Sequence, residues 1–275
     1  MGGDRDDGFA TRLRWWRQRR GFSQLALAHV AEVSQRHLSF LELGRAAPSR
    51  DMVLRLAAAL ALPLRQENDL LVAAGFAPLW RETPLEGAEL AAVSRALDFM
   101  LGQQEPYPAF VVDRRWNLLR ANLGAASLVG FLLDQPGWAP DAAQPVNLAD
   151  ALVAPDLLRP FVANWREVVL YFIRSVHADS VIDGSVETDA LLGRLLSYPD
   201  CPRLSDLPTF EHAEEPVLAM AFVKGTTTLR LFTTLATLGT PRNVTTEEVR
   251  IENFFPADQE TAEVFERWAQ SPGQP

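Results

Sequence analysis

The chain is most constrained by one short segment, residues 23–45, which reads SQLALAHVAEVSQRHLSFLELGR. The segment predicts two short helices joined by a tight turn, because Ser23 and Ser34 can each cap a helix N-terminus. The apolar residues of the two helices recur at helical spacing and face one another: Leu27, Ala28, Ala31, Leu38 and Leu41. The small Ala28 lets the helices cross closely, so we predict a helix-turn-helix.

This packing leaves a polar outer face on the second predicted helix. Such a helix can enter a DNA major groove, and we expect Gln35 and Arg36 to read base edges there. Gln24 and Arg45 are placed to meet phosphates near the two helix ends. The predicted DNA-contacting residues are Gln24, Ser34, Gln35, Arg36, His37, Ser39 and Arg45. Any pair of packed helices with a solvated outer face shares this spacing, and spacing alone leaves that alternative open.

The residue types in the segment are more specific than its spacing. They are the SQ at Ser23-Gln24, the LA at Leu27-Ala28, the VS at Val33-Ser34 and the LSxLExGR from Leu38 to Arg45. In these features the segment resembles the helix-turn-helix of the Cro/repressor-like, xenobiotic-response-element-type regulators. That family usually has glycine where this chain has Glu32, at a turn position that often needs a positive φ. We therefore expect Glu32 either to be strained or to use another turn geometry.

Charge is distributed unevenly along the chain. Residues 1–81 hold 12 Lys and Arg against 8 Asp and Glu, whereas residues 82–275 hold 14 against 27. The net charge of −9 argues against a chain that coats nucleic acid along its whole length. A basic N-terminal part on an acidic body is typical of a DNA-binding head attached to a body that avoids DNA.

The composition is that of an ordinary globular protein, with 48% hydrophobic residues and a mean hydropathy of −0.03. No apolar run reaches the roughly 18 residues of a membrane helix, and the first residues lack a signal-peptide pattern. The single Cys201 forbids an internal disulfide, so we expect a cytoplasmic protein without a membrane partner. The four His residues are scattered and no Cys accompanies them at ligand spacing, so no metal site is expected.

Hydrophobic periodicity divides the 275 residues into two domains and a linker. Residues 1–82 predict an all-α domain of five helices, and residues 83–105 predict a linker helix. Residues 106–275 predict an α+β domain. Its strand-like stretches are 109–112, 116–121, 217–223, 228–238 and 249–254. Helical patterns separate the second stretch from the third, so we expect one five-stranded antiparallel sheet with helices packed on one face.

Such a sheet can leave a mostly apolar cleft beneath its helices. The residues predicted to line the cleft are Phe110, Trp116, Leu118, Trp165, Phe172, Phe222 and Phe232. Arg120 and Asn122 are the predicted anchors for a polar head group, with Arg230 and Arg174 as second choices. Taken singly, each aromatic side chain fits plain core packing better than ligand contact, and Arg120 equally fits a surface ion pair.

Four longer phrases extend the resemblance beyond the helix-turn-helix. They are LLVAAGFAP at Leu70–Pro78, PYPAFVVDRRWNLLRAN at Pro106–Asn122, NWREV at Asn164–Val168 and TLGTPRNVTTEEVRIENFFPADQETA at Thr237–Ala262. With them, nearly the whole chain resembles the MmyB-like regulators. The resemblance implies a PAS-like ligand-binding domain associated with fatty-acid-like small molecules. The family commonly has Asp where this chain has Asn243, so any role of that carboxylate is lost here.

We therefore expect a sequence-specific transcriptional regulator that binds double-stranded operator DNA, is controlled by a small apolar ligand and forms a homodimer. No cofactor is expected other than a bound fatty acid or similar molecule. The dimer surface stays open between the helix around Leu85–Leu101 and an exposed face of the sheet. One alternative is a protein-interaction module with a lipid-binding domain. The other is an enzyme, for which the richest polar cluster is Glu211, His212, Glu214 and Glu215, but no nucleophile, phosphate loop or metal spacing lies nearby, and no catalytic residue is assigned.

Overall fold

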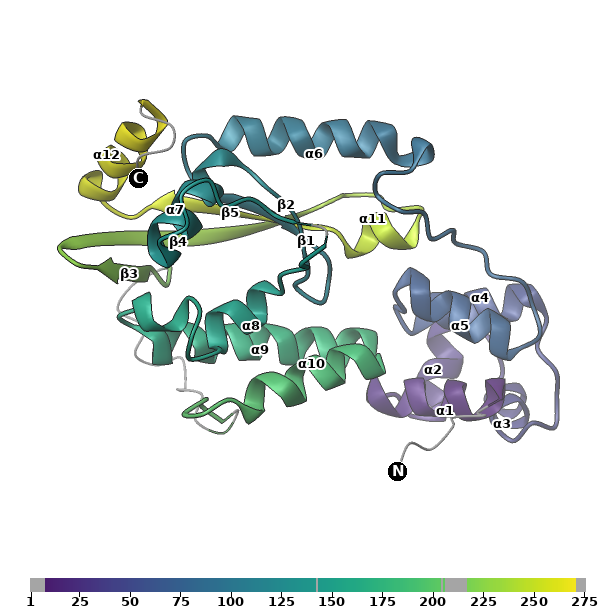
Figure 1. Cartoon of the computed structure of the whole chain (residues 1–275). Coiled ribbons are helices and arrows are strands. Elements are labelled where there is room, and N and C mark those ends of the chain that lie inside the picture. The colour runs from purple at the N-terminus through teal and green to yellow at the C-terminus, as the bar shows by residue number, and fades with distance from the viewer. Residues whose placement is uncertain (1–7, 142, 204, 206–216, 271–275) are drawn as a thin grey trace. The chain divides into compact units, whose positions relative to one another are not determined.

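The computed structural model describes residues 8–141, 143–203, 205 and 217–270, which form two compact units (Figure 1). Unit 1 comprises the chain up to Thr83 together with residues 181–183 and 240–247, and unit 2 comprises the remainder. Within the described residues, no helix combines the length and the apolarity that a membrane span requires.

Five consecutive helices open unit 1, as predicted. They are α1 (Phe9–Arg19), α2 (Gln24–Val30), α3 (Gln35–Glu42), α4 (Arg50–Ala59) and α5 (Leu64–Ala73). The caps are confirmed, because the hydroxyl oxygens of Ser23 and Ser34 accept the backbone N–H groups of Ala26 and His37. The apolar faces meet in a core whose fully buried members include Leu13, Leu27, Leu38, Leu41, Leu56 and Leu71.

The turn between α2 and α3 holds Glu32 in the left-handed region, with φ of 53°. The N–H groups of Glu32 and Val33 donate back to the carbonyl oxygens of His29 and Ala28. This is the hydrogen-bond pattern of a helix that ends on a left-handed residue. For a residue with a β-carbon that conformation costs about 1–2 kcal/mol. Of the two expectations for Glu32, the structure therefore shows the strained one.

Asn243 stands where the resembled family commonly has Asp, and it lies in the part of unit 1 formed by residues 240–247. Its amide nitrogen donates to the hydroxyl oxygen of Thr83 at 3.0 Å, and its amide oxygen accepts the N–H of Thr245 at 2.9 Å. An ionised aspartate could accept the N–H of Thr245 and a hydrogen bond from the Thr83 hydroxyl, but it could not donate to that hydroxyl as the amide does. The amide thus has a structural use of its own.

Unit 2 contains a five-stranded antiparallel sheet in the order β2-β1-β5-β4-β3, which confirms the predicted sheet. The strands are β1 (Ala109–Val112), β2 (Leu118–Ala121), β3 (Met220–Lys224), β4 (Thr227–Thr237) and β5 (Arg250–Pro256). The central strand, β5, comes from the end of the domain and pairs with β1 from its beginning on one side and with β4 on the other. The long chain between β2 and β3 supplies most of the helices.

The longer helices that follow the first five are α6 (Ala91–Gln104), α7 (Leu123–Leu133), α8 (Leu148–Val153), α9 (Trp165–Asp183), α10 (Val186–Ser197) and α12 (Gln259–Gln270), of which α7 to α10 lie between β2 and β3. Short 3₁₀ turns at Ala88–Leu90 and Arg159–Phe161 and the short helix α11 (Val244–Glu248) complete the described elements. The predicted linker helix corresponds mainly to α6, which is part of unit 2.

Both faces of the sheet are covered, which corrects the expectation of helices on one face (Figure 1). Ala109 and Val111 of β1 pack on one face with Leu97 of α6. Phe110 and Val112, which alternate with them, belong to the core formed with α7 to α10 and α12 on the other face. Successive side chains of a strand point to opposite faces, so every residue of β1 is buried.

The strain at Glu32 predicts that glycine is better tolerated there than alanine. Glu32→Gly relieves the β-carbon clash, whereas Glu32→Ala keeps it. We expect the glycine variant to be about 1 kcal/mol more stable than the alanine variant. Urea denaturation followed by helical circular dichroism measures the difference, and equal midpoints would show that Glu32 carries no strain.

Candidate functional site

The outer face of α3 is the first candidate site. Gln35 and Arg36 are exposed, whereas His37 and Ser39 are half-buried. The Arg36 guanidinium lies 5.4 Å from the ring centroid of Phe40, one helical turn further along. Beneath this face Leu38 and Leu41 are fully buried, so the helix is fixed from below while its polar side remains accessible.

A buried carboxylate ties α3 to the two helices that precede it. Glu42 is only 2% exposed. Arg17 of α1 donates to its two oxygens at 2.6 and 3.1 Å, and the Gln24 amide of α2 donates to one of them at 2.8 Å. The Glu42 carbonyl oxygen accepts from Arg14 at 2.7 Å. A buried charge with this many charge-assisted bonds sets the orientation of α3 relative to α1 and α2.

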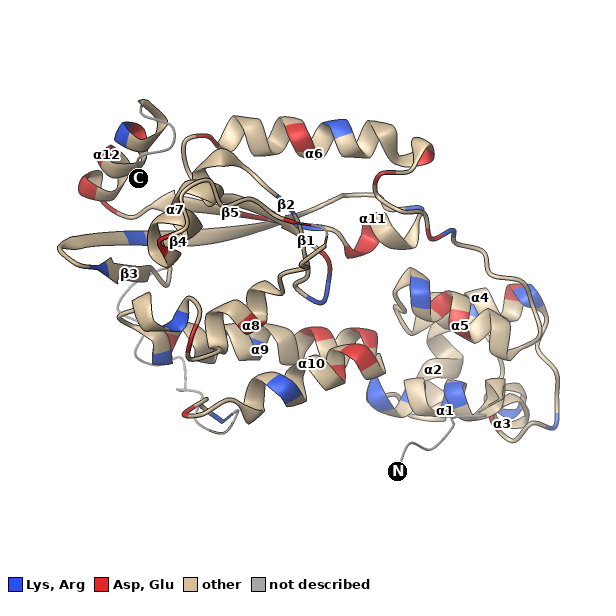
Figure 2. Ribbon diagram, viewed as in Figure 1, with Lys and Arg blue, Asp and Glu red and all other residues tan. Residues whose placement is uncertain are grey.

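The other residues predicted to contact DNA differ in whether their hydrogen-bonding groups already have partners within the protein. One N–H of Gln24 is engaged by Glu42, so a phosphate contact at the start of α2 depends on its other N–H or on the backbone. The Ser34 hydroxyl accepts the N–H of His37 as a helix cap. Arg45 is exposed and follows Gly44, whose φ is 66°. Basic residues also recur along α1 (Figure 2). The DNA contacts themselves stay predictions.

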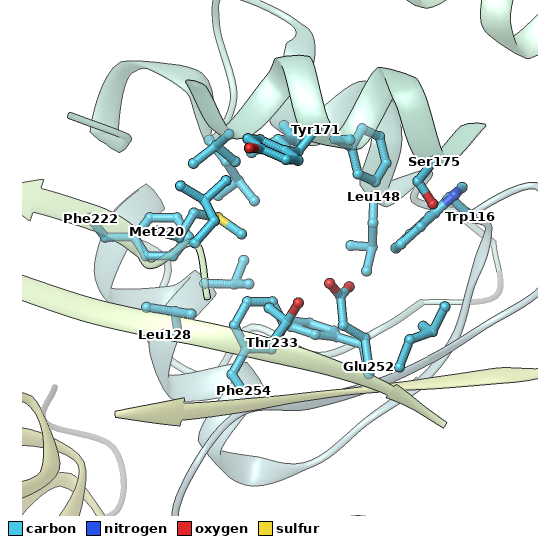
Figure 3. Close-up of a pocket in the computed structure, with 18 of the residues that line it drawn as sticks. Trp116, Leu128, Leu148, Tyr171, Ser175, Met220, Phe222, Thr233, Glu252 and Phe254 are labelled. Atoms are coloured by element: carbon cyan, nitrogen blue, oxygen red, sulfur yellow. The ribbon is translucent and has the colours of Figure 1, made fainter. Parts of the chain in front are cut away.

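The second candidate site is a cavity of about 360 Å³ in unit 2, between the sheet and the helices α7, α8 and α9 (Figure 3). Its volume lies within the usual range of ligand sites. The wall is mostly apolar: Phe110, Trp116, Leu128, Val129, Leu132, Leu148, Leu152, Leu158, Val168, Phe172, Val217, Leu218, Met220, Phe222, Leu235 and Phe254. The polar remainder consists of Tyr171, Ser175, Thr233 and Glu252.

Glu252 supplies the one carboxyl group of this wall. It lies on β5 with Phe110 of β1 on one side and Leu235 of β4 on the other. Figure 3 shows its carboxyl group pointing into the cavity, beside Thr233 and across from Tyr171. Burial raises the pKa of Glu252 to about 7, and a hydrogen bond from the Thr233 hydroxyl opposes that rise. The group therefore changes charge near neutral pH.

Four of the residues predicted to line a cleft lie on the wall of this cavity: Phe110, Trp116, Phe172 and Phe222. The rings of Trp116 and Phe172 contact each other edge to face at 4.6 Å between centroids. The Trp116 indole nitrogen is buried and has no hydrogen-bond partner among the described residues, so it is not displayed at the cavity surface. The structure brings these four side chains together, and their contact with a ligand stays a prediction.

The predicted polar anchors lie elsewhere, which corrects their placement at the pocket. Arg120 pairs with Val111 across β1 and β2, on the face covered by α6, where its guanidinium bonds Asp98 at 2.6 Å and Ser94. Asn122 is the N-cap of α7 and accepts two backbone N–H groups, those of Ala109 and Ala125. Both side chains hold the fold together.

Three predicted aromatic or aliphatic lining residues also lie outside the wall. Phe232 points to the opposite face of the sheet and stacks on Phe255 at 5.5 Å. Trp165 donates its indole N–H to the Leu152 carbonyl oxygen. Leu118, on the edge strand β2, packs against the core. Of the second-choice anchors, Arg230 lies near Asp258, and neither it nor Arg174 is part of the wall.

Sequence reasoning missed Glu252 and the contribution of α8, whose Leu148 and Leu152 line the cavity. A signal existed for Glu252, because it shares a strand face with Phe254 in the alternating run of β5. Only the pairing of β5 with β1 and β4 shows that this face looks into the cavity. The local signal for the short α8 is its N-cap residue Asn147, whose side chain accepts the N–H of Asp150.

The alternative catalytic cluster at Glu211, His212, Glu214 and Glu215 lies outside the described residues. Among the residues that are described, no group of three or more His, Cys, Asp or Glu side chains is placed to hold a metal ion. The two candidate sites are therefore the face of α3 and the cavity of unit 2.

Comparison with models of protein families gives two matches. A family described as the MmyB-like transcription regulator ligand binding domain matches residues 93–267, and a helix-turn-helix family matches residues 13–66. The first match spans more than half of the 275 residues and includes the cavity, and the second includes α3. A comparison with curated proteins gives no match.

The buried position of Glu42 predicts that its charge is needed for the stability of unit 1. Glu42→Gln leaves Arg17 buried without a counter-charge, and we expect a loss of about 3 kcal/mol. Hydrogen exchange of backbone amides in α1, α2 and α3 measures the change in opening free energy. Glu32→Gln, the same chemical change on an exposed neighbour, serves as the control. Equal protection in the two variants would contradict the structural role of Glu42.

Proposed function

The chain belongs to the MmyB-like transcription regulators, DNA-binding proteins with a ligand-binding domain, and we propose that a small apolar ligand in the cavity of unit 2 controls operator binding by α3. The observation that carries this proposal is the pairing of two sites in one chain: an exposed polar helix face and a cavity with an apolar wall.

The part of the proposal that concerns DNA binding is supported by the surroundings of α3. Gln35 and Arg36 are exposed on a helix whose other side is buried, and the Glu42 network fixes its orientation. An arginine can form a bidentate pair with guanine and a glutamine with adenine in the major groove. We propose that these two side chains carry sequence preference, while Arg45 and basic residues of α1 other than Arg17, which is bound to Glu42, contact phosphates.

The ligand half rests on the cavity. Its volume and apolar wall fit the hydrocarbon part of a fatty-acid-like molecule, the class that the family resemblance implies. A ligand shifts DNA binding only as far as it prefers one conformational state over another. We propose that the occupied and empty cavities favour different states of the regulator.

We further propose a homodimer in the cytoplasm, where an operator is accessible. A dimer presents two recognition helices to half-sites about 34 Å apart, or a multiple of that spacing. Light scattering of the purified protein measures its mass, and a monomer at concentrations that saturate the operator would contradict the dimer.

The alternative is a non-catalytic interaction module that uses α3 to bind protein and unit 2 to bind lipid. It shares the exposed helix face but predicts no preference among DNA sequences. The matched families are regulatory, which supports a regulator without an enzymatic activity of its own.

The proposal predicts that the protein prefers duplexes from the region upstream of its own gene over scrambled duplexes. The affinity for both should fall as salt rises, because binding releases counterions from phosphates. Fluorescence anisotropy across a salt series measures both affinities. Absence of any preference at every salt concentration would favour the interaction module.

Removal of the Arg36 side chain should weaken operator binding. Arg36→Ala deletes one bidentate base contact, and we expect a loss of about 1–3 kcal/mol, or roughly 5- to 150-fold in affinity. Scrambled DNA should lose much less. Arg55→Ala removes the same charge from the exposed side of α4 and should keep the sequence preference. Equal effects of the two substitutions on operator and scrambled DNA would show that α3 does not read bases.

A further inference from the structure

The cavity of unit 2 has an unusual distribution of charge for a fatty-acid site. Among the described residues that line it there is no Lys, Arg or His, and of these residues Glu252 is the one that can carry a charge at neutral pH. Arg120, the first-choice anchor in the sequence analysis, is on the other face of the sheet and bonds Asp98. Within the part of the chain that the structure describes, a ligand in the cavity therefore meets a carboxyl group and no counter-charge for a carboxylate of its own.

Strand pairing also fixes the direction of the Glu252 side chain, which points toward the space that a ligand would occupy. Its position in β5 is fixed by pairing with Phe110 on one side and Leu235 on the other, and its carboxyl group points away from the sheet into the cavity (Figure 3). Its one side-chain partner in the described part of the chain is the Thr233 hydroxyl, a neutral donor. No ion pair compensates the charge within the described residues.

An ionised carboxylate in an apolar cavity is unstable unless a cation or several donors replace its hydration. The raised pKa of Glu252, about 7, expresses this cost. Tyr171 is the other titratable residue on the described wall, and no further lining residue within residues 8–141, 143–203, 205 and 217–270 can carry a charge. An ammonium group beside Glu252 would supply the missing counter-charge.

We propose that this cavity selects an apolar molecule that carries an amine, with the protonated amine paired to Glu252 and the hydrocarbon part against the aromatic and aliphatic wall. This inference rests on the proposed ligand control and names the ligand class of the same site. A fatty-acid carboxylate would instead bring a second negative charge beside Glu252, and the two groups could coexist only by sharing a proton.

The mouth of the cavity is compatible with such a ligand. Leu235 is 47% exposed and Ser175 is exposed, although both line the cavity. Figure 3 places Ser175 and Tyr171 on the helix wall opposite Glu252. The hydroxyl groups of these two residues can accept a further hydrogen bond from an ammonium group.

Three probes with one hydrocarbon chain and different head groups test the head-group preference: octylamine, octanoate and octanol. Binding to the full-length protein is measured by isothermal titration calorimetry at about pH 8, where Glu252 is mostly ionised. We expect octylamine to bind at least about tenfold more tightly than octanoate, with the affinity of octanol between them. A tenfold difference in affinity corresponds to the same free energy as a shift of roughly one pKa unit. The shared chain makes the head group the only variable.

The carboxyl group itself is tested by Glu252→Gln, which keeps the side-chain shape and removes the charge. Octylamine binding should weaken about tenfold and octanoate binding should strengthen, which abolishes the preference. Glu260→Gln, an exposed residue in the first turn of α12, should change neither affinity. Thermal unfolding without ligand shows that each variant is folded.

The affinity for octylamine should also depend on pH. Since the ionised form of Glu252 is the one that pairs with an ammonium group, the affinity should rise about tenfold from pH 6 to pH 8 in wild type. In Glu252→Gln this rise should disappear, which separates the effect from any general change in the protein.

Tighter binding of octanoate than of octylamine, equal binding of the two, or no binding of any probe would overturn the amine preference. These outcomes are distinct from failure of the regulator proposal, which is measured by DNA binding. If octanoate binds better and also shifts operator affinity, ligand control stands and the amine preference is wrong. If octylamine binds as expected but leaves operator affinity unchanged, the amine site stands and ligand control is wrong.

Discussion

The alternation of side chains along β1 and β5, between two covered faces of one sheet, is the constraint on which the ligand-binding unit depends. Val111 and Ile251 point toward α6 and help form one core, whereas Phe110 and Phe254 point toward the cavity. A shift of one residue in register would exchange these sets and place Glu252 against α6. The cavity and its one carboxyl group are therefore consequences of strand register.

The same alternation separates Arg120, which the sequence analysis predicted as a ligand anchor, from Glu252, which it did not predict. Arg120 lies on the face that α6 covers, where Asp98 and Ser94 satisfy it. Glu252 lies on the cavity face, where the Thr233 hydroxyl is its one side-chain hydrogen-bond partner among the described residues. Hydrogen bonding thus assigns the arginine to the fold and leaves the glutamate available to a ligand.

In unit 1 a buried carboxylate fixes the relative orientation of the helices, whereas in unit 2 strand register fixes which side chains face the cavity. Glu42, at the C-terminal end of α3, accepts hydrogen bonds from Arg17 of α1 and from Gln24 of α2. Because a buried carboxylate is costly without its partners, this arrangement holds the three helices in one relative orientation. The outer face of α3 can then carry exposed Gln35 and Arg36 on a rigid support.

The sequence by itself determined the features that depend on near neighbours. The caps at Ser23 and Ser34, the apolar spacing of α2 and α3, and the strand-like alternation of unit 2 are all local patterns, and helices and strands form wherever such patterns occur. The positive φ at Glu32 was also a local expectation. Tertiary structure decided the rest, because Glu252 meets Phe110 and Leu235 only through pairing of distant strands. Tertiary packing also places α6 on the second face of the sheet. Arg120 therefore lies beneath α6 and not in the cavity.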